Sequence, residues 1–197
     1  MGYYIRVLGK KPGNVSLQSL RDTAHPAVLK VSQGTEDEWQ EVTLTHESGQ
    51  EIAVIEKNPV VDGQLGADEL QEFIDEIGHY RPESAVTWLR QFLPTVKVIY
   101  AFQLLSGTDV DDGWTPFHRV HSAVWNHVGG ILQADGEGFS DEDGFTILWQ
   151  FADTATGLWN MGTWQDGHWV HFAMDLGNEP QREAFKRGEL PNGVKIV

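Results

Sequence analysis

The spacing of apolar residues along this chain changes between a helical period and a strand period, so the fold must combine both kinds of element. The clearest helix is marked by four apolar residues at the i, i+3, i+4, i+7 spacing: Leu70, Phe73, Ile74 and Ile77. Gly78 follows them and is expected to end this helix. A second helix is predicted from Pro82 to Phe92 or Leu93, because proline is favoured in a first helical turn and Pro94 cannot continue the helix.

A third helix is predicted over residues 115–128, with Thr115 as its N-cap and Pro116 at its first position. Gly129 and Gly130 are expected to end this helix, since glycine tolerates the left-handed conformation that closes many helices. Two shorter helical stretches complete the set: residues 16–21 and 179–187.

Short runs rich in β-branched and aromatic residues alternate with these helices and are predicted to form strands. In the N-terminal part they are residues 3–8, 28–32, 41–46, 51–56 and 96–104. In the C-terminal part they are residues 131–134, 145–151, 158–164 and 168–174. Four residues at every second position of the second of these are expected to face inward: Phe145, Ile147, Trp149 and Phe151. Asp166-Gly167, between the last two runs, is a strong hairpin signal.

These elements predict an α+β fold, with a small N-terminal sheet and packed helices followed by a helix and a C-terminal antiparallel β-meander. Residues 1–197 are expected to form either one core or two subdomains, of residues 1–106 and 107–197, with the boundary in the turn at 107–113. The chain is 40% hydrophobic and has 8 Trp, so it can bury a core without a stabilising crosslink.

The chain contains no cysteine, which excludes a disulfide scaffold, a thiolate zinc site and a cysteine nucleophile. A reducing cytoplasmic environment fits this composition best. Residues 1–8 resemble a strand and lack the features of a signal peptide. No run approaches the roughly 18 apolar residues of a membrane helix, so no membrane span is expected.

The charge balance is strongly negative, with 29 Asp and Glu against 14 Lys and Arg, for a formal net charge of −15. Such a balance disfavours nucleic acid as a partner, because phosphate binding depends on Lys and Arg. Residues 102–181 hold twelve of the acidic residues and a single basic one, Arg119. This span also contains six of the eight Trp, so a functional surface is expected there.

The most unusual local feature is an acidic, glycine-rich loop that contains Asp135, Glu137, Asp141 and Asp143. Hard divalent cations prefer several oxygen ligands on a flexible backbone, so Asp135 and Glu137 are candidate metal ligands, although the loop does not match the calcium-binding template. The same two carboxylates lie two residues apart and could act as an acid and base pair. The simpler interpretation is a solvated acidic loop whose glycines serve a tight turn.

The sequence gives little evidence for other metal-binding or catalytic sites. His118 and His121 lie three residues apart on the third predicted helix, but His121 falls on its apolar stripe and is interpreted as a core residue rather than a zinc ligand. His168 and His171 would face opposite sides of a strand and are not expected to share an ion. The motifs of serine hydrolases, P-loop enzymes and dinucleotide-binding enzymes are absent.

Four Trp residues are distributed over the predicted C-terminal meander: Trp149, Trp159, Trp164 and Trp169. Each ring is expected to be either part of the core or an exposed group that binds a partner or a sugar. Trp159 and Trp164, which have polar neighbours, are the candidate binding residues.

The leading hypothesis from the sequence is a non-enzymatic protein of the inhibitor or immunity type that binds a basic protein partner. Clustered negative charge accelerates encounter with such a partner, and aromatic residues supply contact energy. One alternative is a metal-assisted hydrolase that uses Asp135, Glu137 and either Asp141 or Asp143 as oxygen ligands, with a nearby histidine as acid or base. A second is a carbohydrate-binding module that uses Trp159, Trp164 or Trp169. No resident cofactor is predicted, a divalent cation is expected only under the hydrolase alternative, and the sequence does not indicate an oligomeric state.

Overall fold

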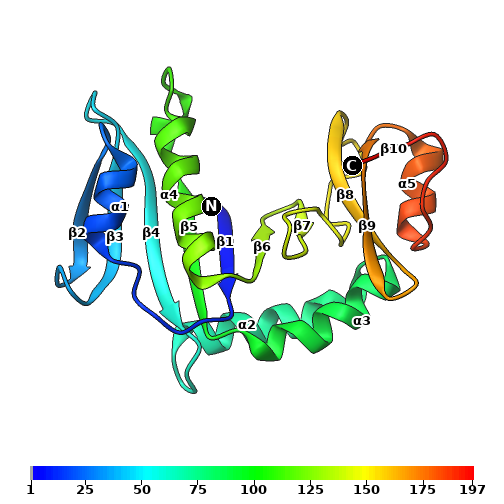
Figure 1. Cartoon of the computed structure of the whole chain (residues 1–197), viewed down its shortest axis with the longest axis horizontal. Coiled ribbons are helices and arrows are strands. Elements are labelled where there is room, and N and C mark those ends of the chain that lie inside the picture. Colours follow the sequence, from blue (N-terminus) through cyan, green and yellow to red (C-terminus); the bar gives the residue numbers. More distant parts are fainter. Residues whose placement is uncertain (1) are drawn as a thin grey trace. The chain divides into compact units, whose positions relative to one another are not determined.

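The computed structural model describes residues 2–197, and the chain divides into two compact units (Figure 1). The first unit contains the residues up to Asp68 and the segment Val96–Gly130. The second contains Glu69–Thr95 and Ile131–Val197. Each unit is therefore built from two separate stretches of sequence, whereas the sequence suggested a linear division at residues 107–113.

The predicted α+β class is confirmed, since helices and antiparallel strands are present in both units. The first unit contains β1 Tyr3–Gly9, α1 Leu17–Ala24, β2 Val28–Gly34, β3 Trp39–Thr45, β4 Glu51–Pro59, β5 Val98–Leu104, the 3-10 helix η3 Ser106–Asp109 and α4 Trp114–Val128. The second contains η1 Ile77–His79, α3 Glu83–Phe92, η2 Leu93–Thr95, β6 Ile131–Ala134, β7 Gly138–Phe139, β8 Leu158–Gln165, β9 His168–Asp175, α5 Glu179–Lys186 and β10 Lys195–Ile196. Helix α2, Leu65–Glu76, crosses the boundary between the units.

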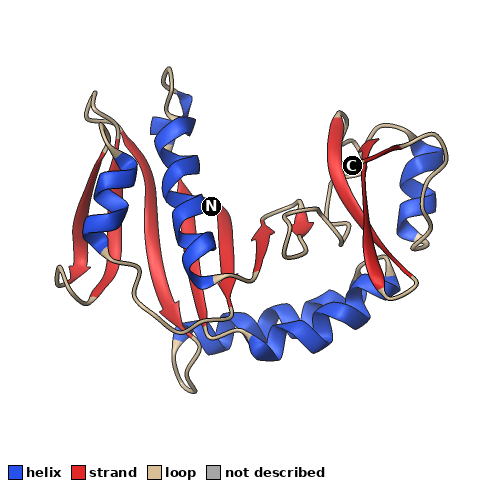
Figure 2. Cartoon of the chain, in the orientation of Figure 1, coloured by secondary structure: helices blue, strands red, loops and turns tan. Residues whose placement is uncertain are grey.

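The first unit is a five-stranded antiparallel sheet in the order β2-β3-β4-β5-β1. Helices α1 and α4 pack together on one face of this sheet (Figure 2). The core of this unit lies between the sheet and the two helices and includes the fully buried Trp39, Tyr100 and Phe102. The polar atoms of two of these rings have partners, because Trp39 Nε1 donates to the Val15 carbonyl at 3.0 Å and the Tyr100 hydroxyl donates to the Gly13 carbonyl at 2.9 Å.

The second unit contains the β6-β7 hairpin and a three-stranded antiparallel sheet in the order β10-β9-β8. The predicted turn at Asp166 and Gly167 is confirmed, and both residues have the positive φ angles that a tight hairpin turn needs. One cluster of buried residues forms much of the core: Trp149, Phe151, Met161, Phe172, Met174, Leu176 and Phe185.

The strand expected over residues 145–151 is wrong. This stretch makes only isolated bridges, and Ile147, Leu148 and Trp149 are buried one after another instead of at every second position. The cause is a change of hydrogen-bond partner along the chain. The Ile147 amide donates to the Phe139 carbonyl at 2.8 Å, whereas the Trp149 amide donates to the Arg81 carbonyl at 2.7 Å, so no single neighbouring strand is followed.

The start of the third predicted helix is also corrected. Helix α4 begins at Trp114 with Gly113 as its N-cap residue, so Pro116 is its third residue rather than its first. The Thr115 hydroxyl instead bonds to the side chain of Asp112 in the preceding turn. The helix ends at Val128, and Gly129 has a φ of 65°, which agrees with the predicted glycine ending. Among residues 2–197, no helix has the length and apolar content required to cross a membrane.

Candidate functional site

The acidic loop lies in the second unit and begins at the turn between β6 and β7. Asp135, Gly136 and Glu137 form this turn, and Gly136 has a φ of 72°. Gly138 has a φ of 114°, and a Cβ atom there would lie 2.1 Å from the Leu148 carbonyl oxygen. Glycine is therefore required at Gly138 by close backbone packing, whereas the tight turn that the simpler interpretation predicted is made at Gly136.

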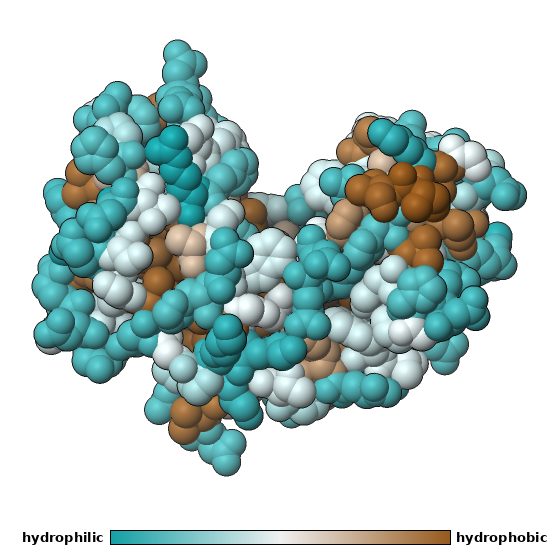
Figure 3. Space-filling view, viewed as in Figure 1, coloured by the Kyte–Doolittle hydropathy of each residue, from teal (hydrophilic) through white to brown (hydrophobic). Residues whose placement is uncertain are grey.

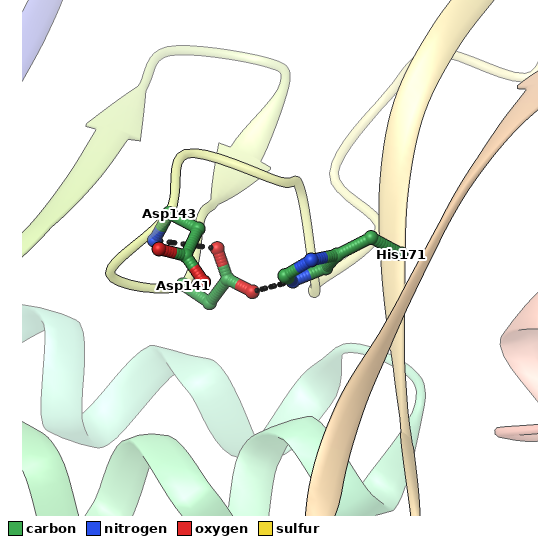
Figure 4. Close-up of side chains that lie close together, drawn as sticks. All are labelled: Asp141, Asp143 and His171. Atoms are coloured by element: carbon green, nitrogen blue, oxygen red, sulfur yellow. Dashed lines mark hydrogen bonds and ion pairs between the residues drawn. The ribbon is translucent and has the colours of Figure 1, made fainter. Parts of the chain in front are cut away.

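Asp141 has a different environment from the other carboxylates of the loop, because its side chain is only 1% exposed. Its Oδ1 atom accepts from the amides of Asp143 and Phe145, both at 3.0 Å. Its Oδ2 atom lies 2.5 Å from Nε2 of His171 on β9. Asp141 therefore stabilises its own turn and also links that turn to a strand thirty residues later (Figure 4).

An aromatic ring also packs against the face of the His171 imidazole. The Phe145 ring stacks on the imidazole with a centroid distance of 3.9 Å and an interplanar angle of 8°. Phe145 also donates its amide to Asp141, so one residue positions both members of the pair. The sequence did not indicate this pair, since His171 and Asp141 are far apart along the chain and belong to no shared motif.

Among residues 2–197, the side chains of Asp141, Asp143 and His171 form a group whose atoms lie near enough to one another to ligate a metal ion in principle. The 2.5 Å separation of His171 Nε2 and Asp141 Oδ2 is too short for an ion between them, because ligands of tetrahedral zinc lie about 3.3 Å apart. Asp143 is exposed, and its amide already donates to Asp141. The arrangement of these residues fits a structural role, in which Asp141 holds the loop to strand β9, better than a metal centre. Asp135 and Glu137, the ligands that the sequence suggested, are not in this group.

Three Trp residues of the second unit pack against one another, whereas Trp149 and Trp159 both contact Phe151. Trp164 makes an edge contact with Trp169 at 4.9 Å, and Trp169 contacts Trp88 at 5.4 Å. Trp159 donates its Nε1 hydrogen to the Thr146 hydroxyl at 3.0 Å. The two Trp residues proposed from the sequence as binding groups, Trp159 and Trp164, are thus both half-buried.

Hydrophobic side chains do reach the surface at other places. On the face shown in Figure 3, most of the surface is hydrophilic and hydrophobic side chains gather near the C-terminal sheet. Leu158, Ile196 and Val197 are among the exposed apolar residues of that sheet and its flanks. Trp114 is the large aromatic residue that is most exposed in the part of the chain described here, at 43%. The sequence reasoning did not select it.

Trp114 is the first residue of α4 and follows an acidic turn. Asp109, Asp111 and Asp112 in that turn are all exposed. His118, one helical turn after Trp114, is also exposed, and its ring lies 5.4 Å from the indole. We refer to Asp109, Asp111, Asp112, Trp114 and His118 as the Trp114 surface. It combines negative charge with an exposed aromatic ring in one short segment.

His121 lies one turn further along α4 and is buried, at 8% exposure. Its ring contacts those of Phe102 and Phe117, and its Nε2 atom has no hydrogen-bond partner within residues 2–197. Burial lowers the pKa of His121 to about 4, and the neighbouring His118 contributes a further decrease. The interpretation of His121 as a core residue therefore agrees with its position.

The chain matches no protein-family model, no curated protein and no solved structure. The function is accordingly inferred from the residues themselves.

Proposed function

We propose that this protein is a non-enzymatic interaction protein of the inhibitor or immunity type, which binds a basic protein partner through the Trp114 surface. The observation that carries this proposal is an indole, exposed by 43%, that lies within five residues of three exposed aspartates. A cytoplasmic location fits the cysteine-free composition and is part of the same proposal.

The charges of this surface favour a cationic partner. Arg119 is the single basic residue between residues 102 and 181, and its guanidinium donates to the His25 carbonyl at 3.2 Å. Within residues 2–197, neither Asp109 nor Asp111 takes part in an ion pair. Their uncompensated charge would attract a positive surface over a distance of about 8 Å at physiological salt.

Trp114 would supply the contact energy that charge alone does not. Exposed Trp residues are enriched among the residues that dominate binding free energy at protein interfaces. An indole face also attracts the cationic groups of Lys and Arg. A basic partner can therefore pair with the aspartates and cover the ring in the same contact.

The two alternatives from the sequence have less support. The metal-assisted hydrolase would need Asp135, Glu137 and a third carboxylate around one ion, but among residues 2–197 Asp135 and Glu137 do not belong to the group of nearby potential ligands. Within that group, Asp141 Oδ2 and His171 Nε2 lie 2.5 Å apart, which leaves no room for an ion between them. The carbohydrate-binding module would need an exposed ring platform, but Trp159, Trp164 and Trp169 are all half-buried.

The experiment that tests this proposal begins with affinity isolation of partners and identification of the bound protein. The identified partner is then produced and titrated with this protein by calorimetry at about 50 and about 300 mM salt. We expect a basic partner whose affinity falls as salt rises. We also expect Trp114→Ala to weaken binding by about tenfold or more, as for a central interface residue.

Asp62→Asn provides the matched control, because Asp62 is an exposed acidic residue of the same unit that lies outside the Trp114 surface. This variant should bind as the wild type does. A partner of neutral or acidic charge, or an affinity that Trp114→Ala leaves unchanged, would contradict the proposal.

A further inference from the structure

A second feature of interest is a pocket of about 240 Å³ that lies entirely in the second unit. One wall comes from residues at helical spacing along α2 and η1: Phe73, Glu76, Ile77 and Tyr80. A second wall comes from the β6-β7 hairpin: Gln133, Asp135, Gly136 and Phe139. Gln150 completes the lining. We call this the Glu76 pocket.

The two walls each contribute one carboxylate. Glu76 is exposed on the helical wall, and its side chain makes no hydrogen bond or ion pair within residues 2–197. Asp135 is half-buried on the hairpin wall. An ionised carboxylate offers about four lone-pair sites, so Asp135 can accept from a ligand in addition to its contacts within the chain. A group that enters this pocket therefore meets negative charge from two directions.

The remaining lining is aromatic and amide in character. Phe73 and Phe139 meet edge to face at a centroid distance of 5.4 Å, and Phe139 is almost fully buried. Tyr80 adds a half-buried ring with a hydroxyl group. Gln133, at 5% exposure, and Gln150 add amide oxygens. A Cβ atom at Gly136 would meet nothing within 4 Å, so the hairpin leaves space beside the pocket.

The chemistry of this lining selects a cation. Among the described lining residues there is no Lys, Arg or His, so the pocket itself supplies no positive charge. Aromatic rings attract cations through their faces, and carboxylates pair with them directly. The pocket is smaller than the roughly 300 to 1,000 Å³ of most small-molecule sites, which suits one side-chain group rather than a whole metabolite.

We propose that the Glu76 pocket binds the guanidinium group of an arginine side chain from a protein partner. A planar guanidinium offers five donors in a fork that matches carboxylate and amide oxygens, and its plane stacks on aromatic rings. A lysine ammonium lacks both the fork and the plane. This inference extends the proposed function by naming a side chain of the basic partner, but it involves different residues from the Trp114 surface, so either can fail alone.

The test uses the full chain labelled with ¹⁵N and four small probes followed by amide chemical shifts. Nα-acetyl-arginine methylamide represents an arginine within a protein chain, and the matching citrulline compound is its neutral analogue. The lysine counterpart tests the ammonium group, and agmatine tests a free guanidinium metabolite. We expect shifts centred on Gly136 and Tyr80 with the arginine probe, affinity about tenfold weaker for lysine, and no binding of citrulline.

Glu76→Gln removes the helical carboxylate at an exposed position and should weaken the arginine probe by about tenfold without changing the melting temperature. Asp135→Asn should have a similar effect from the other wall. Glu72→Gln is the control, because Glu72 is exposed on the same helix but does not line the pocket. Trp114→Ala should leave the probe affinity unchanged, which separates this inference from the proposed function.

Three outcomes would overturn the inference. Equal binding of the arginine and citrulline probes would show that charge is not recognised. Binding of agmatine without the arginine probe would assign the pocket to a free metabolite instead of a side chain. Equal losses from Glu76→Gln and Glu72→Gln would indicate a general charge effect rather than a site.

Discussion

His121 in the first unit and His171 in the second both lie against aromatic rings, yet their ring nitrogens have opposite surroundings. His171 Nε2 lies 2.5 Å from the buried carboxylate of Asp141. His121 Nε2 is buried between Phe102 and Phe117 with no hydrogen-bond partner among the described residues. The comparison teaches that aromatic burial alone disfavours the charged imidazole, whereas an added carboxylate turns the same side chain into a link between distant segments.

The largest expected change in stability comes from removing the carboxylate of Asp141, the partner of His171. Asp141→Ala leaves His171 and the amides of Asp143 and Phe145 without their acceptor, so we expect a loss of about 3 to 5 kcal/mol in the free energy of unfolding. Urea denaturation measures this loss. Asp143→Ala is the control and should cost less than about 0.5 kcal/mol, because its side chain is exposed. Equal losses in the two variants would mean that the loop acts through net charge.

The burial of His121 predicts that the stability of the protein decreases in acid. The folded state lowers the pKa of His121 to about 4, whereas the ordinary value is 6.5, so between these values the unfolded chain binds a proton that the folded chain does not. The free energy of unfolding should therefore decrease as pH falls below 6.5, by up to roughly 3 kcal/mol near pH 4.

His121→Phe isolates this contribution from that of the carboxylates, which also titrate in acid. Urea denaturation of both proteins at several pH values should give a shallower decrease for the variant. Identical pH dependence would show that His121 is solvated in the folded protein, and the contrast with His171 would then be lost.

A smaller loss of stability is expected from replacing His171, the partner of Asp141. His171→Phe retains a ring that can stack on Phe145 but removes the partner of Asp141 Oδ2. The two backbone amides still bond to Asp141, so the loss should be about 1 to 3 kcal/mol, less than for Asp141→Ala. Urea denaturation measures it. A loss as large as that of Asp141→Ala would show that the histidine, not the turn, accounts for the stability of this link.

The smallest effect on stability is expected at an exposed aspartate. Asp111→Asn should change the free energy of unfolding by less than about 0.5 kcal/mol, because this side chain has no partner within residues 2–197. The same variant should weaken binding of the basic partner, measured by calorimetry, and reduce the salt dependence of that binding. A large loss of stability would instead place Asp111 with Asp141 among the structural carboxylates.

The elements with a clear local pattern could be predicted. The apolar stripe that contains Leu70 and Ile77 does lie on helices α2 and η1, and the Asp166-Gly167 turn does join two strands. The stretch 145–151 could not be predicted, because its backbone amides bond to several distant segments in turn. An alternating pattern assumes one neighbouring strand, and this stretch has none.

The candidate site was predictable only in part. The acidic loop was found because five carboxylates and three glycines are concentrated in residues 135–144, which is a local property. The pairing of Asp141 with His171 was missed, since it joins residues separated by thirty positions. Trp114 was also missed, because neighbours in sequence do not determine whether a ring is covered by other parts of the chain.

The sequence by itself determined the α+β class, the main helices, the hairpin turn and the concentration of negative charge, since these depend on local spacing and composition. Only the tertiary structure decided which carboxylate is buried, which Trp is exposed, and that Glu76 and Asp135 line one pocket. It also grouped Glu69–Thr95 with the C-terminal segment. The physical reason is that burial, pairing and pocket formation depend on contacts between residues far apart in sequence, which no local pattern records.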